Sequence, residues 1–557
     1  MKTRSAPFNL GQALGEAVAL HRGGQLREAE RIYARVLKAA PDHFDALNLL
    51  GAIKIAQGQF GEAQRLFAAA VKANPAIAAG WNNLGQAQYA LKRPADALQS
   101  FDKARALAPD DVDILYQHAN ALVGLNRHRE ALAELQTVLA RKPQHFEARL
   151  NSGLAQAALG FAEAALADFD AALALSPRHP VAHFNRGVVL IKLRRYAEAV
   201  AANERAIAAA PDYVTAWLNR GMALAQLRRF DEAIASYGEV LARRNDNADA
   251  HFNRALARLT TGDYRTGFED YEWRWRRTGM TAPKSRGRRL WLGDTPLQGK
   301  TILLHAEQGL GDTIQFARYA PLLAAQGVKV VLEVQPELKS LLSRLDCVAA
   351  VAARGEAPPP FDVHCPLGSV PLARKTELAT VPAPIPYLGA DEAHLNKWSA
   401  RIGTLARPRI AIAWAGNPAH DNDRNRSIAF SALAALFASS LAASFIGIQR
   451  EPRGDEAAQL AAQPGLTHIG GELASFDDTA AVLALCDLLI TVDTAPAHLA
   501  GAMGRPVWVL VPFAPDWRWT LDGETTPWYP TARIFRQSAL ADWNAVIASV
   551  AAALRGL

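Results

Sequence analysis

The sequence has few cysteines and lacks a long apolar run. Its 557 residues contain only Cys347, Cys365 and Cys486, which lie far apart and match no metal-binding spacing. This scarcity argues against a disulfide scaffold and predicts a reducing, cytoplasmic location. No apolar stretch reaches the ~20 residues that a membrane-spanning helix needs. The basic N-terminus has no apolar core behind it, so we expect no signal peptide.

Acidic residues are absent from one stretch of the chain. Half of all residues are apolar and 21% are charged, which is typical of globular proteins, and the length predicts two to four domains. The net charge of +7 is concentrated in residues 273–289, which hold seven Arg or Lys and no acid. We favour a solvated linker for this stretch. The alternative is contact with an anionic partner or a substrate phosphate.

Proline, glycine and alanine each recur every 34 residues in the first half of the chain. The proline positions are Pro41, Pro75, Pro109, Pro143, Pro177 and Pro211. Small residues at two fixed positions allow two helices to cross closely, and proline ends the second helix. This period is typical of tetratricopeptide repeats. We therefore expect residues 9–272 to form an α-solenoid of seven repeats and a degenerate closing unit, with a concave surface.

Carboxamides occupy one further position of the repeat. They are Asn83, Gln117, Asn151, Asn185, Asn219 and Asn253. Because a carboxamide both donates and accepts hydrogen bonds, such a ladder can hold an extended peptide backbone. The arrangement is similar to the asparagine ladder of the O-linked N-acetylglucosamine transferases, which implies a protein or peptide acceptor. The alternative is that these side chains solvate the groove or bridge adjacent helices.

The second half of the chain alternates strands and helices. Aromatic residues between Tyr264 and Trp275 are expected to cap the last repeat against the next domain. After a basic linker at 273–297 we expect two Rossmann-like lobes, a reduced one at 298–395 and a second at 396–557 that ends in a closing helix. No nucleic-acid-binding motif is present, and the loop after 300–305 lacks the Lys-Ser or Lys-Thr of a P-loop.

One strand, turn and helix carry the strongest signal. The apolar run 488–492 predicts a buried strand, and Asp493 and Thr494 follow it. Pro496 suits the first turn of a helix, whose N-terminal N–H groups can hold an anion such as a diphosphate. His498 lies one helical turn beyond Thr494, so both can face one ligand.

These residues, together with Leu499-Ala500 and Gly504-Arg505-Pro506, resemble the nucleotide-sugar motif of the bacterial heptosyltransferases, family nine of the glycosyltransferases. The resemblance implies an inverting, two-lobed (GT-B type) enzyme that binds a nucleotide-diphosphate sugar as substrate. Because no Asp-x-Asp pair stands at the end of a predicted strand, and arginines and helix N-termini can hold the diphosphate instead, we expect no metal and no cofactor. It places Asp493, Thr494, Ala495 and His498 in the donor site. The alternative for this segment is an ordinary Rossmann crossover with a satisfied histidine.

A glycine-rich loop is the candidate for the catalytic base. Gly309 and Gly311 let the backbone approach a ligand, and Asp312 lies at the start of a predicted helix at 314–324. The family has a similar Gly-Asp, whose aspartate is its base, so the resemblance implies that Asp312 deprotonates the acceptor hydroxyl. The alternative role is helix capping. His305 and Glu307 are reserve candidates.

The second lobe supplies further donor-binding candidates after its strands. Gly416 and Asn417 follow the strand 409–414, and Arg424 or Arg426, the latter preferred, is expected to clamp the diphosphate. Gln449 ends the next strand. Trp517 or Trp519 is a candidate to stack on the donor base or to line the sugar pocket, and a core tryptophan is at least an equal alternative.

The sequence thus predicts a glycosyltransferase that transfers a sugar to a hydroxyl of a protein held by the repeats. Two alternatives stay open. One is a cell-envelope or polysaccharide glycosyltransferase whose repeats recruit partners, and the other is a catalytically inactive repeat scaffold.

Overall fold

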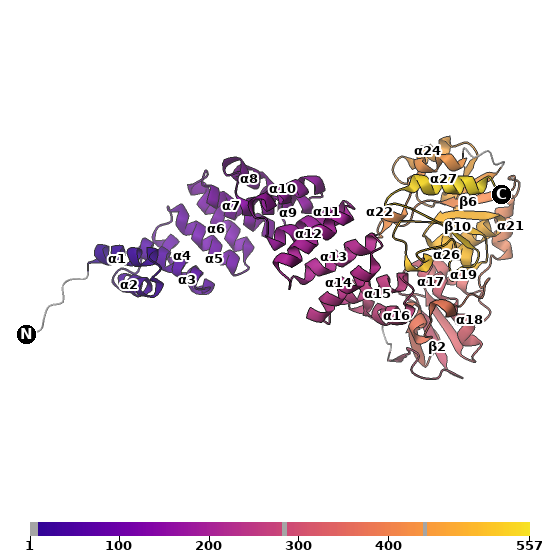
Figure 1. The fold of residues 1–557 in the computed structure, drawn as a ribbon. Coiled ribbons are helices and arrows are strands. Elements are labelled where there is room, and N and C mark those ends of the chain that lie inside the picture. The colour runs from indigo at the N-terminus through magenta and orange to yellow at the C-terminus, as the bar shows by residue number, and fades with distance from the viewer. Residues whose placement is uncertain (1–8, 281–286, 421, 438–442, 557) are drawn as a thin grey trace, which may run out of the picture. The chain divides into compact units, whose positions relative to one another are not determined.

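The computed structural model describes residues 9–280, 287–420, 422–437 and 443–556. The chain divides into two compact units, residues 1–216 and 217–557. The first unit consists of consecutive helix pairs, and the second adds two parallel sheets to the last repeats (Figure 1). Among the described helices, none is both long and apolar enough to cross a membrane.

Helices of 13 and 14 residues alternate through the first unit. They are α1 (Leu10–Arg22), α2 (Leu26–Ala39), α3 (Phe44–Ala56), α4 (Phe60–Ala73), α5 (Ala78–Ala90), α6 (Pro94–Leu107), α7 (Val112–Gly124), α8 (His128–Arg141), α9 (Phe146–Ala158), α10 (Ala162–Leu175), α11 (Pro180–Lys192) and α12 (Tyr196–Ala209). The boundary between the units falls inside α13 (Val214–Gln226). This regular pairing confirms the predicted solenoid.

The glycine column marks the crossing point inside each pair. A Cβ at Gly51 would lie 2.5 Å from the Phe67 ring, and one at Gly85 would lie 2.5 Å from the Phe101 ring. Only hydrogen fits between the two helices there, because an aromatic ring of the second helix presses on the first. The proline column follows two residues after the second helix ends, for example Pro41 after α2. Proline therefore terminates the pair as expected.

The last repeats belong to the second unit. Their helices are α14 (Phe230–Arg243), α15 (Ala248–Thr260), α16 (Tyr264–Tyr271) and the 3₁₀ turn η1 (Glu272–Arg276). Tyr264 and Phe268 each meet the Trp517 ring edge-on at 5.7 Å, and Trp528 Nε1 donates to the Tyr264 hydroxyl at 2.9 Å. The aromatic cluster therefore caps the array against the next domain, as the sequence predicts.

One part of the linker prediction is wrong. Arg274 is not solvated, because its side chain is only 1% exposed and pairs with Glu272 and Glu307. Arg277 lies over the Phe252 ring and bonds to Asp249. The alternation of Trp and Arg lets the rings cover the cations. The basic positions at 281–286 lie outside the described residues.

The first sheet has five parallel strands in the order β1-β5-β2-β3-β4. Its strands are β1 (Arg289–Leu290), β2 (Thr301–His305), β3 (Lys329–Val334), β4 (Val348–Ala353) and β5 (Val363–Pro366). Its helices and turns are α17 (Leu310–Phe316), α18 (Tyr319–Ala324), α19 (Pro336–Leu342), η2 (Leu367–Ser369), α20 (Val370–Ala373) and η3 (Leu378–Thr380). The single helix expected at 314–324 is in fact two, because Pro321 is favourable only in the first turn of a helix.

The second sheet has six parallel strands in the order β11-β10-β9-β6-β7-β8. Its strands are β6 (Arg409–Ala413), β7 (Ser444–Gly447), β8 (Leu466–His468), β9 (Leu488–Val492), β10 (Val507–Val511) and β11 (Ala532–Arg536). Its helices and turns are α21 (Glu392–Ile402), α22 (Asp423–Arg426), η4 (Phe430–Leu433), α23 (Ala434–Phe437), α24 (Glu456–Ala462), η5 (Gly470–Glu472), α25 (Phe476–Leu485), α26 (Ala495–Ala502), η6 (Trp517–Trp519) and α27 (Trp543–Leu554). Strands β6, β9 and β10 are buried along their whole length, as expected of a sheet covered on both faces.

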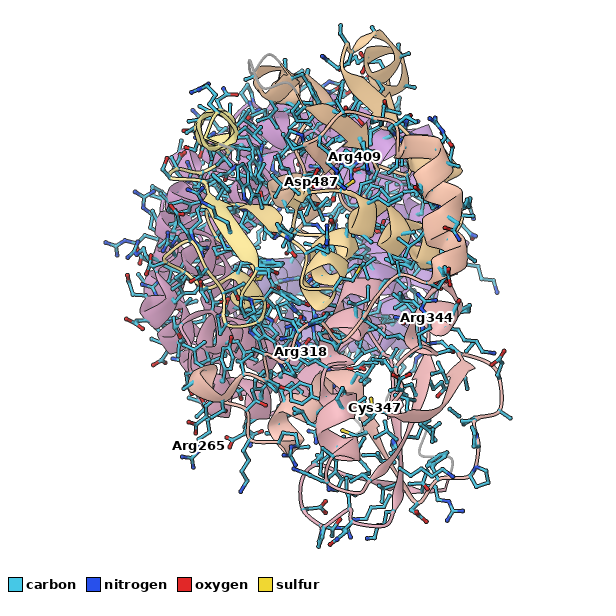
Figure 2. All side chains as sticks on the ribbon, turned by 90° about the vertical axis from the view of Figure 1, so that its right-hand side faces the viewer. Arg265, Arg318, Arg344, Cys347, Arg409 and Asp487 are labelled. Carbon is cyan, nitrogen blue, oxygen red and sulfur yellow. The ribbon has the colours of Figure 1, made fainter. Side chains whose placement is uncertain are left out.

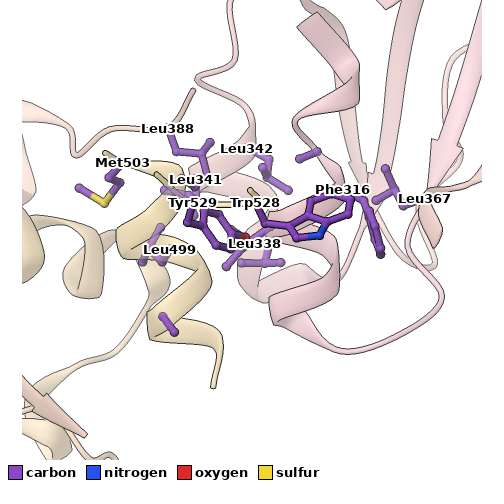
Figure 3. Close-up of a cluster of buried hydrophobic side chains, with 14 of the residues drawn as sticks. Phe316, Leu338, Leu341, Leu342, Leu367, Leu388, Leu499, Met503, Trp528 and Tyr529 are labelled. Atoms are coloured by element: carbon purple, nitrogen blue, oxygen red, sulfur yellow. The ribbon is translucent and has the colours of Figure 1, made fainter. Parts of the chain in front are cut away.

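One apolar core joins the two sheets. Phe316 and Leu338 from the first region pack with Leu499, Trp528 and Tyr529 from the second (Figure 3). At the start of the second sheet, Asp487 accepts from the backbone N–H of Arg409 at 2.8 Å and aligns β6 with β9 (Figure 2). The shared core packs the first sheet against the second, and Asp487 fixes the pairing within the second sheet.

Candidate functional site

The second sheet reverses its strand order between β6 and β9. In the sequence, β6 is the first strand of this sheet and β9 the fourth, and the two are neighbours in space. The same strand order is found in the doubly wound dinucleotide-binding fold. In such sheets the loops after these two strands separate and leave a crevice for a ligand at their carboxyl ends. Here those loops are formed by the described residues 414–420 and 422–427 and by the turn at Asp493-Thr494.

Arg426 connects the two loops. Its Nη1 donates to the backbone oxygen of Asp493 at 3.0 Å, and its side chain is 14% exposed. Gly416 lies flat against the guanidinium, because a Cβ there would come within 2.6 Å of Nη2. Arg424 is exposed instead. Of the two arginines left open by the sequence, Arg426 is therefore the one placed at the switch point.

A second arginine at this loop was missed. Arg453 Nη2 donates to the backbone oxygen of Gly416 at 2.6 Å and pairs with Asp423 Oδ2 at 2.8 Å. It lies in the loop after β7, the strand next to β6 in the same sheet. The sequence signal was the basic Arg450 to Arg453 segment at the carboxyl end of a predicted strand.

The Asp493 turn and α26 form as predicted, with Thr494 as the residue before the helix and Pro496 in its first turn. His498 is buried, and its Nδ1 lies 3.0 Å from the Tyr529 hydroxyl. Its Nε2 lies 3.8 Å from Asp493 Oδ1. One imidazole edge is thus fixed by Tyr529, and the other is directed toward the carboxylate.

The glycine-rich loop of the first sheet contacts this turn. A Cβ at Gly311 would lie 2.6 Å from Cδ2 of His498 and 3.5 Å from Cα of Ala495. Glycine is therefore needed at 311 for the starts of α17 and α26 to meet. The structure brings Gly309, Gly311 and Asp312 together with Ala495 and His498, although nearly two hundred residues separate them.

Asp312 is held by two groups. Its Oδ2 accepts from the backbone N–H of Gly309 at 3.0 Å, so it caps α17, and its Oδ1 pairs with Arg518 Nη2. Arg518 also donates to Gln315 and bonds Asp516 at 2.9 Å. No local pattern marks Arg518, which lies between Trp517 and Trp519, as a partner of Asp312. No sequence motif joins this pair, because 206 positions separate the partners.

Burial and neighbouring charges shift the pKa values of Asp493 and His498 at the turn. Burial, with the nearby Asp516 carboxylate, raises the pKa of Asp493 to about 6. Burial, with the neighbouring Arg518, Arg318 and Arg426 cations, lowers the pKa of His498 well below its usual range. The imidazole is therefore neutral at pH 7, and each nitrogen is a donor or an acceptor according to its tautomer.

Other predicted donor residues support the loops. Gln449 accepts from the backbone N–H groups of Trp414 and Ala415 and so closes the end of β6. Asn417 accepts from the Ala419 N–H inside its own loop. Trp517 is 2% exposed in the aromatic core, which favours the core alternative over stacking on a donor.

His305 lies at the end of β2, where its Nε2 is 3.1 Å from Nδ1 of His364 on β5. Glu307, the other reserve candidate, is buried against Arg274. Within the described residues, no cluster of three His, Cys, Asp or Glu side chains has the arrangement of a metal site.

The carboxamide ladder is half-buried throughout its predicted positions. In two repeats it bridges neighbours, since Asn83 donates to Asn48 at 2.9 Å and Asn151 donates to Asn120 at 3.2 Å. Asn185 bonds back to Val181 O in its own helix. Bridging, one of the alternatives, therefore occurs at Asn83 and Asn151. The roles of Gln117, Asn219 and Asn253 remain predictions.

Known protein families match both the repeat half and the second half of the chain. The tetratricopeptide repeat model matches residues 14–53, 52–112, 116–180, 153–214 and 218–271. The glycosyltransferase family 9 (heptosyltransferase) model matches residues 442–541, which include the Asp493 turn.

A curated relative and two solved structures are similar to this chain. Protein FlbA of Caulobacter vibrioides is 28% identical over 324 residues, which cover 53% of this chain and 53% of that protein. The chain thus matches about half the length of this relative. A tetratricopeptide repeat protein from Parabacteroides merdae is 16% identical, with a TM-score of 0.36, over 44% of this chain and 98% of that one. The tetratricopeptide protein YrrB is 21% identical, with a TM-score of 0.30, over 33% of this chain and 95% of that one. Repeats, sheet topology and family matches together identify a chain that joins tetratricopeptide repeats to a glycosyltransferase family 9 (heptosyltransferase) domain.

Proposed function

We propose that this chain is a glycosyltransferase of the GT-B type that moves a sugar from a nucleoside-diphosphate sugar to an acceptor hydroxyl. The observation that carries the proposal is the meeting of Gly311 with His498, because it sets Asp312 beside the Asp493 turn. Sugar transfer needs a carboxylate on one side of the reacting carbon and a cationic or dipolar group for the leaving diphosphate on the other.

The donor is held at the switch point of the second sheet. The start of α26 and the Arg426 guanidinium face the same turn, and both favour an anion there. Neutral His498 can donate one hydrogen bond to a phosphate or sugar oxygen. These groups neutralise the diphosphate as it leaves, and the proposal requires no metal for that step.

The acceptor is activated from the first sheet. Asp312 takes the proton of the acceptor hydroxyl while its oxygen attacks the anomeric carbon and the bond to the diphosphate breaks. Attack opposite the leaving group inverts the configuration at that carbon. Arg518 fixes the carboxylate so that its other oxygen stays in one orientation.

The acceptor is a protein or peptide bound by the repeats. Tetratricopeptide arrays bind peptides, and three ladder positions, Gln117, Asn219 and Asn253, remain candidates for contact with a peptide backbone. The unpaired state of the three cysteines supports a reducing, cytoplasmic location.

A specific observation favours one alternative. Asn83 and Asn151 already bond to neighbouring repeats, so part of the ladder stabilises the array. If the remaining ladder has the same role, the repeats recruit partners and the acceptor is a cell-envelope or polysaccharide glycan.

A ligand screen tests the donor half of the proposal. A nucleoside diphosphate at 100 times its Kd should stabilise the second unit by about 2.7 kcal/mol, which calorimetry detects as a rise in Tm. The same screen with Arg426→Met should show a smaller rise. Absence of a shift with every nucleoside diphosphate and nucleotide sugar would leave the inactive scaffold as the function.

A further inference from the structure

The end of the repeat array meets the glycine-rich loop at one buried arginine. Arg274 Nη1 donates to Glu272 Oε1 at 2.6 Å, and Nη2 donates to Glu307 Oε1 at 3.1 Å and to Ser369 Oγ at 2.6 Å. Nη1 also donates to the backbone oxygen of Tyr271. A single guanidinium thus links η1, the loop after β2 and the turn after β5.

The position of this guanidinium is fixed. It lies between the Tyr271 ring at 4.8 Å and the Trp275 ring at 4.3 Å, and the side chain is 1% exposed. A buried charge is tolerated only where its partners are well placed, and removal of one partner leaves the other charge uncompensated. The position of Glu307 therefore depends on Arg274 far more than it would in a surface ion pair.

The loop is attached to the repeat side at two successive residues. Glu307 bonds to Arg274, and Gln308 Nε2 donates to the Tyr271 hydroxyl. Glu307 Oε1 also accepts from the Gly368 N–H at 3.0 Å, which anchors the loop to the first sheet. Gly309 follows directly and begins α17, which carries Asp312.

Provided that the proposed function is correct, we infer that Arg274 is a positioning residue that sets the place of Asp312 through Glu307 and the loop. The η1 turn that directly follows the last helix pair then holds the catalytic loop in place. Displacement of a reacting group by about 1 Å costs on the order of 10²-fold in rate, so a loosened loop impairs turnover without contact with substrate.

The test compares Arg274→Met with a matched control in the full-length chain. The control is Arg254→Met, because Arg254 of the same repeat bonds the buried carboxylate of Asp270 at 2.7 and 2.8 Å. For each protein we would measure the Tm, amide hydrogen exchange of residues 306–312, the Kd for a nucleoside diphosphate, and kcat. Arg274→Lys is a second variant that keeps the charge if Arg274→Met does not fold.

The expected result separates positioning from stability. In Arg274→Met, exchange in residues 306–312 becomes at least ~10-fold faster and kcat falls ~10²-fold, while the nucleoside-diphosphate Kd changes less than about 3-fold. In Arg254→Met the Tm falls, but loop exchange and kcat stay within about 3-fold of wild type. Arg274→Lys should recover part of the turnover, because it can still reach one carboxylate.

Three other outcomes are decisive. Unchanged loop exchange in a folded Arg274 variant would overturn the inference whatever the activity. Faster exchange with unchanged kcat would confirm the attachment but overturn the positioning role. If the wild-type protein transfers no sugar, the proposed function is refuted. Faster loop exchange in the Arg274 variant would then still establish that Arg274 attaches the loop.

Discussion

Asp312 has two hydrogen-bonding tasks, and one substitution can separate catalysis from capping. Asp312→Asn keeps an oxygen that can accept from the Gly309 N–H, so α17 remains capped. It removes the proton acceptor and the charge that pairs with Arg518, so we expect kcat to fall by roughly 10²-fold or more and the Tm to fall as well. Turnover of labelled nucleotide sugar measures this effect.

The control is Asp542→Asn, because Asp542 caps α27 by accepting from the Ala545 N–H. It should leave kcat unchanged. A wild-type rate in Asp312→Asn would assign the base to another carboxylate.

Arg426 and Arg424 form a natural pair for testing the diphosphate site. Arg426 bonds the Asp493 turn, and Arg424, two residues earlier, is exposed. A charge-assisted hydrogen bond contributes about 1.5–3 kcal/mol, so Arg426→Met should weaken nucleoside-diphosphate binding roughly 10- to 100-fold. Calorimetric titration provides the Kd, and Arg424→Met should leave it near wild type. Equal losses in both variants would indicate a diffuse electrostatic effect of the whole loop.

Glu307 should make stability depend on pH near neutrality. Burial, only partly offset by Arg274, raises its pKa from 4.5 to about 7. Between these values the folded chain holds a proton that the unfolded chain has released. The free energy of unfolding therefore decreases as pH rises from about 4.5 to 7, by roughly 3 kcal/mol in total.

Glu307→Gln removes this titration, so its Tm should depend less on pH than the wild-type Tm over pH 5 to 8. Differential scanning calorimetry of the second unit's transition measures the slope. The exposed Glu337→Gln on α19 is the control. An identical slope in wild type and Glu307→Gln would show that the carboxyl is already ionised at pH 5.

At the scale of elements, the helix pairs depend on glycine at their crossing. Gly85→Ala puts a methyl 2.5 Å from the Phe101 ring and forces the helices apart, so we expect a loss of about 1–3 kcal/mol. Gly15→Ala, in the exposed middle of α1 with no atom within 4 Å, should instead stabilise its helix by about 0.5–1 kcal/mol. Urea unfolding of both variants checks this contrast in sign. Destabilisation by both variants would show that the contact with Phe101 does not explain the need for glycine at 85.

Local patterns predicted most of these elements because their causes are local. The strand 488–492, the turn at Asp493 and the helix after it follow from an apolar run, polar closing residues and Pro496. The contacts that complete the site have no such signal. Gly311 meets His498, and Asp312 meets Arg518, only because the two sheets pack together. Arg274 looked solvated, since sequence alone does not show that Glu307 lies beside it.

At the scale of the whole molecule, the acceptor class separates the two leading functions. Simultaneous replacement of Gln117, Asn219 and Asn253 by Ala should reduce transfer to protein acceptors by at least ~10-fold, because each lost hydrogen bond contributes about 1 kcal/mol. Hydrolysis of the donor should be unaffected, since the donor residues lie elsewhere. Parallel assays of transfer and hydrolysis measure both effects.

Replacement of Asn83 and Asn151 provides a contrasting variant, because these side chains bond to Asn48 and Asn120. It should lower the Tm of the array more than it lowers transfer. Equal loss of transfer and hydrolysis in the variant that lacks Gln117, Asn219 and Asn253 would argue against peptide binding and for a glycan acceptor.

The placement of α15 and α16 in the same unit as both sheets bears on how such chains diversify. Repeats before α13 can be duplicated, deleted or exchanged without a change in the aromatic cluster around Tyr264 and Trp528. The last pair, α15 and α16, cannot be exchanged in this way, because its side chains pack against the glycosyltransferase domain. Chimaeras that graft foreign arrays should therefore be joined upstream of α13, with the native final repeats retained.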